Sequence, residues 1–133
     1  MLIENSTFTD NFAKFVNHGI TLISSLVEMR ESKVMFSPGF ADHLDLSRLD
    51  TGFFNLFPAS KLYIKDNTIF MNLKALNQAV INAISQSDVF ISNNVTFINN
   101  TLSSEGGQTI GLQNTRNVDI SGARFIGNKQ TNI

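Results

Sequence analysis

The sequence predicts an all-β protein, a right-handed parallel β-helix of about 4–5 coils with 27–28 residues in each coil. Three observations predict it: a recurring phenylalanine, short apolar-x-apolar alternations, and Asn or Gly at fixed distances from each phenylalanine. One coil cannot bury its apolar side alone, so the coils must stack. The right-handed winding follows from the general chirality of parallel β connections.

The recurring phenylalanine sets the period. Successive members of the series are 28, 34, 27 and 28 residues apart, and the series is Phe8, Phe36, Phe70, Phe97 and Phe125. A loop insertion over residues 42–52 accounts for the one longer interval. Equivalent residues of stacked coils lie about 4.8 Å apart, so we expect these five rings to form a single stack.

Short alternations of apolar residues predict the strands. Residues 27–29, 62–64, 89–91 and 118–120 each read apolar-x-apolar, and so do residues 20–22 and 110–112 in the middle of their coils. A period of two is the signature of a half-buried strand. Each coil therefore has three short strands joined by corners.

Asparagine and glycine mark the corners. Three residues before most of the phenylalanines stands Asn or Gly, and three residues after them stand Asn11, Asn100 and Asn128. These two residue types adopt positive φ at the lowest cost. We expect the asparagines of successive coils to form hydrogen-bonded ladders.

Residues 73–86 allow two predictions. Leu73, Leu76, Val80, Ile81 and Ile84 follow a helical spacing, whereas the repeat places a strand near residues 79–84. A short helix packed on one corner would leave the stack intact.

The chain is expected to be one segment over residues 1–133, cut from a longer repeat protein. It begins inside one unit and ends just past Asn128, without a polar amphipathic cap. Exposed β edges need such caps, so the partners we expect are further coils of the same chain or other protein subunits.

Charge and composition exclude several classes of protein. Ten basic and eleven acidic residues give a net charge of −1 without a basic cluster, so no nucleic-acid partner is expected. No apolar run is long enough for direct membrane insertion as a helix. The chain has no cysteine, which excludes disulfides and thiolate metal sites.

The Phe-x-x-Asn units, which begin at Phe8, Phe90, Phe97 and Phe125, occur together with Gly106-Gly107 before an apolar strand. This combination resembles the passenger repeats of polymorphic outer-membrane proteins and autotransporters, and the repeats of large pectin-lyase-like surface proteins of single-celled eukaryotes. The best match runs from Asn94 to Asn128. The resemblance implies a right-handed β-helix at a cell surface that serves as a stalk, an adhesin or coat material.

Three Asn-x-Ser/Thr sequons make Asn5, Asn94 and Asn99 candidate N-glycosylation sites. The other interpretation is chance in a chain with sixteen asparagines. A laddered asparagine cannot carry a glycan, which argues against modification of Asn94.

Residues that could perform chemistry are sparse. The densest acidic cluster, Asp42, Asp45 and Asp50 with His43 and Arg48, is either a sugar or Ca²⁺ site or simply a solvated loop. His18 has no base or ligand partner at a useful spacing. Arg116 and Arg124 with Asp119 could contact an acidic sugar, or they could be ordinary surface residues.

We therefore expect a non-catalytic structural or adhesive segment of an extracellular or cell-surface protein, with Asn/Thr/Ser-rich faces for assembly or glycan contact. No catalytic residue, cofactor or metal is expected. The alternative is a polysaccharide lyase or glycosidase, or a degenerate glycan-binding relative on the same fold.

Overall fold

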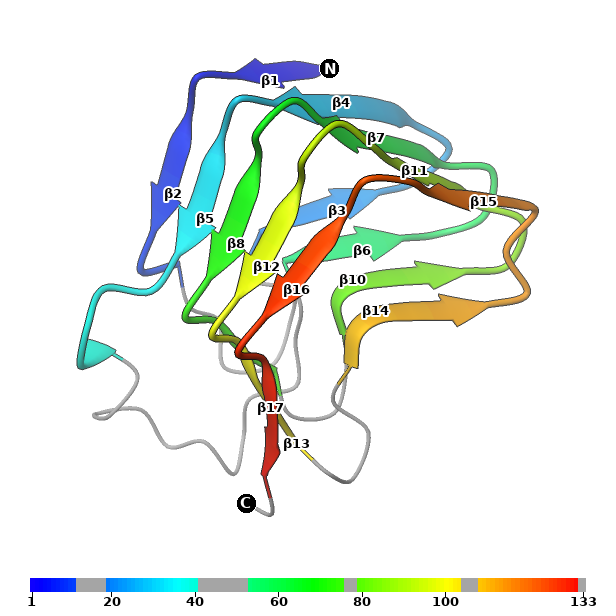
Figure 1. Ribbon diagram of the computed structural model, residues 1–133. Coiled ribbons are helices and arrows are strands. Elements are labelled where there is room, and N and C mark those ends of the chain that lie inside the picture. Colours follow the sequence, from blue (N-terminus) through cyan, green and yellow to red (C-terminus); the bar gives the residue numbers. More distant parts are fainter. Residues whose placement is uncertain (12–18, 41–52, 76–78, 104–107, 132–133) are drawn as a thin grey trace.

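The computed structural model confirms a parallel β-solenoid of about four turns and describes residues 1–11, 19–40, 53–75, 79–103 and 108–131. Within these ranges every pair of neighbouring strands is parallel and no α-helix occurs. Figure 1 shows the turns stacked side by side, with β1 at one end of the stack and β15 at the other. The insertion predicted over residues 42–52 lies outside the described residues.

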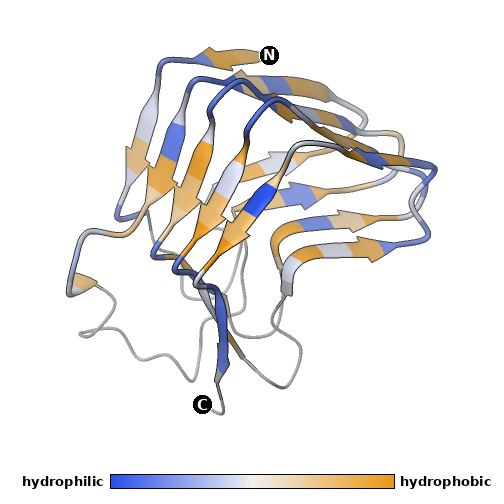
Figure 2. Ribbon diagram, viewed as in Figure 1, coloured by the Kyte–Doolittle hydropathy of each residue, from blue (hydrophilic) through white to orange (hydrophobic). Residues whose placement is uncertain are grey.

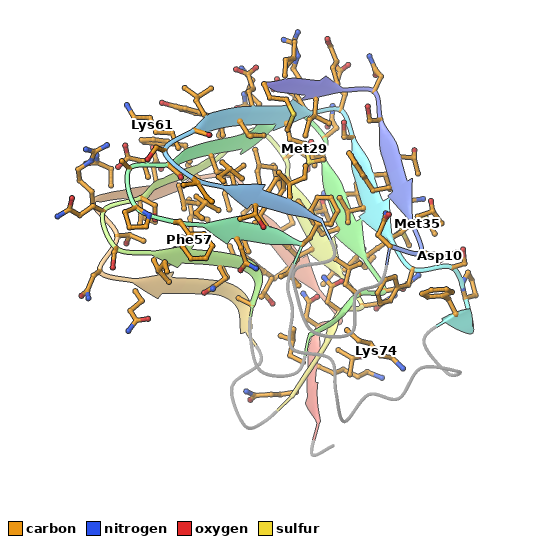
Figure 3. All side chains as sticks on the ribbon, turned by 180° about the vertical axis from the view of Figure 1, so that it is seen from behind. Asp10, Met29, Met35, Phe57, Lys61 and Lys74 are labelled. Carbon is orange, nitrogen blue, oxygen red and sulfur yellow. The ribbon has the colours of Figure 1, made fainter. Side chains whose placement is uncertain are left out.

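Sheet A contains one strand from each turn: β1 (Leu2–Glu4), β4 (Leu26–Arg30), β7 (Lys61–Lys65), β11 (Asp88–Ile91) and β15 (Asn117–Ile120). Alternate residues face the interior, as Figure 3 shows for Met29 of β4. One inward column is Ile3, Met29, Ile64, Ile91 and Ile120. A column of this kind arises because stacked parallel strands in register place the same sequence position above itself.

Sheet B follows sheet A in each turn. Its strands are β2 (Thr7–Thr9), β5 (Lys33–Met35), β8 (Ile69–Met71), β12 (Thr96–Ile98) and β16 (Arg124–Ile126). Only the middle residue of each faces inwards, which gives the column Phe8, Val34, Phe70, Phe97 and Phe125. The rings of Phe70 and Phe97 are 5.0 Å apart and those of Phe97 and Phe125 are 5.1 Å apart, both pairs nearly parallel.

Phe36 is not a member of this column, and the prediction that placed it there is wrong. Val34 occupies the position, and Phe36 comes two residues later, at the corner, where its ring contacts Phe40. The space beside Val34 is filled by Phe53, whose ring lies 5.2 Å from Phe8 and 6.3 Å from Phe70. A ring that arrives from a later segment of the chain therefore replaces the one missing from the column.

Sheet C completes the first four turns, and among the described residues the narrow sheet D adds a further strand to the later turns. Sheet C consists of β3 (Ile20–Leu22), β6 (Phe54–Leu56), β10 (Ala79–Ile84) and β14 (Gln108–Gln113), and the narrow sheet D consists of β9 (Lys74–Ala75), β13 (Thr101–Ser103) and β17 (Lys129–Thr131). Two inward columns of sheet C are Ile20, Phe54, Ile81 and Ile110, and Leu22, Leu56, Ala83 and Leu112.

The helix considered for residues 73–86 is wrong for the described part of that segment. Residues 74–75 and 79–84 are strands, and Leu76 lies outside the described residues. Ile81 pairs with Phe54 on one side and with Ile110 on the other, so the backbone groups of β10 bond sideways. Pairing with two neighbours therefore outweighed a local pattern that suited a helix.

The corner between sheets A and B depends on left-handed backbone conformations. Positive φ angles occur at Asn5, Glu31, Asn67, Asn94 and Gly122, which are equivalent corner positions. Glu31 is the unexpected member, because counting back three residues from Phe36, as for the other phenylalanines, leads to Lys33 instead. The same shift of two residues therefore explains both errors in the second turn.

The core is the space enclosed by sheets A, B and C. Its largest fully buried side chains include Phe54, Phe70, Phe97, Met29 and Ile64. Figure 2 shows apolar residues alternating with polar ones along the strands. Full burial of one such side chain stabilises the fold by about 1.5–3 kcal/mol, so the stacked columns are the main source of stability.

Candidate functional site

The outer face of sheet A carries charged side chains that bridge neighbouring turns. Arg30 pairs with Glu4 at 3.0 Å, and Lys65 pairs with Glu28 at 2.9 Å. All four side chains are about one-third exposed, so each pair contributes at most about 1 kcal/mol to stability. These pairs connect one turn to the next.

Asp88 is the one carboxylate of the described residues that is nearly fully buried. Arg116 lies one turn later and donates from Nε to Oδ1 at 3.0 Å and from Nη2 to Oδ2. Asn117 also donates to Oδ1, and Lys61, labelled in Figure 3, lies 3.9 Å from Oδ2. Sequence reasoning missed this cluster, although Arg116 follows Asp88 by 28 residues, one full period.

The Arg116 hydrogen bonds lower the pKa of Asp88 below its usual range; burial opposes this shift, and Asn117 and Lys61 reinforce it. A general acid or base at neutral pH needs a pKa near 7, which for a carboxyl group means a raised value. The Asp88 cluster therefore joins three successive turns through a carboxylate that is held in its charged form.

Tyr63 and Phe90 form an aromatic pair on the outer face of sheet A. Their ring centroids are 4.7 Å apart and their planes differ by 11°. The rings lie on successive turns, so each covers one face of the other. Asp119 follows Phe90 in the same column.

Asn100 and Asn128 form a ladder inside the corner between sheets B and D. Asn100 accepts from the Leu73 backbone N–H at 2.9 Å and donates to the Phe70 carbonyl at 3.2 Å. Asn128 repeats this pattern one turn later with the Asn100 N–H and the Phe97 carbonyl. Asn11 is exposed, and at its corner Asp10 holds the next turn by accepting from the N–H and hydroxyl of Ser37.

The remaining asparagine ladders are external. Asn93 donates to Asp66 at 3.1 Å, Asn94 donates to Asn67 at 2.8 Å, and Asn82 donates to Asn55 at 3.2 Å. The three sequon asparagines, Asn5, Asn94 and Asn99, are exposed. Of these, Asn94 has its amide in a ladder.

The residues considered for carbohydrate chemistry are not brought together. His18 and the whole acidic segment from Asp42 to Asp50 lie outside the described residues, as does Gly106-Gly107. Arg124 and Asp119 are exposed on different sheets, and Arg116 is bonded to Asp88. Across the described ranges, no three His, Cys, Asp or Glu residues are grouped as metal ligands would be.

A groove of about 360 Å³ crosses the corner between sheets B and D. It is lined by Phe36, Ser37, Pro38, Gly39, Asn72, Lys74, Asn99 and Thr101. Among the described residues, this lining has hydrogen-bonding groups and the cation of Lys74 but not the carboxyl pair that glycoside hydrolysis requires.

The last turn leaves core positions uncovered. Leu112, Val118, Ile120 and Phe125 occupy inward columns, yet they are 39–52% exposed. The described residues contain no helix that is long and apolar enough to cross a bilayer.

No protein-family model matches the chain, and neither a curated protein nor a solved structure matches it.

Proposed function

We propose that the chain is a non-catalytic structural or adhesive segment of an extracellular or cell-surface protein, similar in role to pectin-lyase-like surface repeats. The observation that supports this most directly is the use made of its polar side chains. Asp88 and Asn100, the buried carboxylate and the buried amide of the described residues, are both engaged in bonds between turns. A buried group that is engaged in this way strengthens the fold and is less available to a substrate.

The adhesive part of the proposal relies on the outer face of sheet C. Its outward column is Thr21, Asn55, Asn82 and Gly111, an uncharged row in which Asn82 donates to Asn55 and the glycine is buried. Amide and hydroxyl groups on a rigid face can bond to sugar hydroxyls without the loss of side-chain freedom that a flexible loop would incur. The exposed sequons fit a secreted protein.

Incubation with neutral and acidic polysaccharides separates this function from the polysaccharide-active alternative. We expect neither new reducing ends nor unsaturated uronate products, and weak retention on at least one immobilised polysaccharide. Asn82→Asp should reduce that retention, whereas Asn114→Asp, at a corner away from the row, should not. Turnover of any polysaccharide would overturn the proposal. Antibody labelling of intact source cells tests the surface location.

A further inference from the structure

The outer face of sheet B differs from the outer faces of sheets A and C. Sheet A carries ion pairs on its outer face, and sheet C carries an uncharged column of Thr, Asn and Gly. On sheet B, the last residue of each strand points outwards, away from the buried middle residue. From the second turn onwards these residues form a column that we call the apolar row: Met35, Met71, Ile98 and Ile126.

The apolar row makes the strands of sheet B apolar on both sides. In β8 the inward Phe70 is fully buried, whereas the outward Ile69 and Met71 are partly exposed. Parallel strands that are apolar on both sides are typical of sheets that are covered on both faces. The row crosses four turns and is about 14 Å long at the spacing of neighbouring strands. Met35, its first member, is labelled in Figure 3.

Cations border the apolar row on both sides. The other outward column of sheet B contains Lys33 and Arg124, together with Thr7, Ile69 and Thr96. Beyond the corner, one column of sheet D consists of Lys74, Thr101 and Lys129. Neither of these two columns contains an acidic residue. Lys33 and Arg124 are also not among the cations that Glu4, Glu28 and Asp88 hold in ion pairs.

The acidic residues that flank sheet B in the described chain stand at its corners. Glu31 and Asp66 lie at the corner towards sheet A, where Asp66 accepts a hydrogen bond from Asn93. Asp10 lies at the other corner, and its carboxylate accepts from the N–H and the hydroxyl of Ser37. The outer face of sheet B is therefore apolar along its length, with positive charge on both sides.

We propose that this face binds to an anionic lipid surface, with the apolar row at the boundary of the acyl chains and the bordering cations at the headgroup phosphates. Interfacial binding to membranes combines buried apolar area with attraction between basic side chains and anionic lipids. The chain would lie on the headgroup layer and would not span the bilayer. This inference goes beyond the proposed structural role and does not depend on it.

Charge complementarity favours a lipid surface over a second copy of the chain. Two copies that packed through this face would bring Lys33 and Arg124 of both chains together, and the columns of this face contain no acidic residue to offset them. A hydrophilic anionic polymer would engage the cations but would leave the apolar row uncovered. An anionic bilayer satisfies both parts of the face.

Co-sedimentation of the full chain with vesicles tests the proposal. We expect binding to vesicles made of equal parts of phosphatidylcholine and phosphatidylserine, and much weaker binding to vesicles of phosphatidylcholine alone. Added salt should reduce the binding, because it screens the attraction between the cations and the lipid phosphates. Equal binding to both kinds of vesicle would contradict the role of the cations.

Lys33→Gln should weaken binding to the mixed vesicles by about fivefold, which is the effect of one cation near an anionic membrane surface. Lys65→Gln is the matched control. It makes the same change of charge on the outer face of sheet A, where Lys65 is paired with Glu28, and it should leave the binding unchanged. Equal weakening by the two variants would show that net charge, and not this face, determines the binding.

Ile98→Thr should also weaken the binding, by about fivefold or more, because it removes apolar area from the row and keeps a β-branched side chain in the strand. Ile23→Thr is the matched control, since Ile23 is 67% exposed beyond the end of β3 and lies outside sheet B. Far-UV circular dichroism verifies that the variants keep their strands.

A fluorescent label provides a readout that does not require a loss of binding. The chain has no cysteine, so Met71→Cys and Ile23→Cys each introduce a unique thiol for an environment-sensitive dye. The mixed vesicles should shift the emission of the dye at position 71 to shorter wavelength and leave that at position 23 unchanged.

Two results would overturn the inference. One is a folded, monomeric chain that does not bind the mixed vesicles. The other is a dimer that Ile98→Thr dissociates, without vesicle binding, which would assign the apolar row to a second copy. Neither result bears on polysaccharide turnover, so the failure of either proposal can be recognised separately.

Discussion

The side-chain amide of Asn128 donates to the carbonyl oxygen of Phe97 in the preceding turn, at 2.9 Å. This bond joins the aromatic column to the asparagine ladder, because Phe97 belongs to the former and Asn128 to the latter. It also gives a physical reason for the two Phe-x-x-Asn units that begin at Phe97 and Phe125. After the strand ends, the asparagine satisfies backbone groups of the preceding turn that the bend leaves without a strand partner.

Asn100→Ala should destabilise the fold by about 2–3 kcal/mol. The change leaves the Leu73 N–H and the Phe70 carbonyl without partners in a buried corner, and each unsatisfied group carries a desolvation penalty. Urea denaturation followed by circular dichroism measures the loss. Asn128→Ala is the control, with a smaller expected effect, because Asn128 is only partly buried and water can replace its bonds. Equal effects at the two positions would contradict this account of the ladder.

Val34→Phe should destabilise the protein by about 1–3 kcal/mol, even though it completes the phenylalanine column. Val34 is 2% exposed, and the neighbouring space already holds Phe53, which contacts both Phe8 and Phe70. A second ring there would overpack the core. Thermal denaturation provides the comparison with the wild-type chain. A more stable Val34→Phe variant would show that the column has room for another ring.

Phe97→Ala should lower the free energy of unfolding by about 3–5 kcal/mol. Phe125→Ala should lower it by clearly less. Phe97 is fully buried between two rings, so its removal creates a cavity that cannot collapse. Phe125 is half exposed at the open end and has one stacking partner. Chemical denaturation of the two variants measures the difference. The same cost for both would contradict the assignment of Phe125 to an uncovered turn.

Stability should fall in acid because of Asp88. The pKa of this carboxyl group is lowered in the folded protein, chiefly by the Arg116 hydrogen bonds, relative to about 3.9 when unfolded. Its stabilising contribution is therefore complete above about pH 4 and is lost as the pH falls from there through the folded-state pKa. Denaturation midpoints between pH 7 and pH 3 measure this dependence.

Asp88→Asn is the control for that pH series. This variant should be less stable than the wild type at pH 7, because it loses the charge-assisted bonds from Arg116, and it should lose less stability between pH 4 and pH 3. An identical acid dependence in both chains would assign the effect to other carboxyl groups.

Gly19→Ala should be poorly tolerated. A Cβ atom at this position would lie 2.3 Å from the backbone oxygen of Phe53, which cannot move without disturbing the first turn. Gly122→Ala is the matched comparison: its Cβ would have no neighbour closer than 3.5 Å, although its φ of +72° adds strain of about 1 kcal/mol. Thermal denaturation should therefore rank Gly19→Ala well below Gly122→Ala.

The regular repeats could be predicted from the sequence because equivalent positions have the same surroundings in each turn. The inward places of Phe70, Phe97 and Phe125, and the pairing of residues 89–91 with 62–64 and 118–120, follow from period alone. The second turn could not be predicted in this way. Phe36 and Val34 are both apolar, and only the ring of Phe53, which comes from beyond the insertion, distinguishes their places.

The sequence by itself determined the architecture, because a period of 27–28 residues with apolar alternation and Asn corners can bury its core only by stacking in parallel. The tertiary structure decided which groups meet across turns. Asp88 finds Arg116, Tyr63 finds Phe90, and the core is covered at Ile3 but uncovered at Ile120. The physical reason is that the length of the repeat fixes which positions are stacked. The burial and the pairing of a side chain depend instead on which residues the neighbouring turns place against it. At the last turn, within the described chain, nothing lies above.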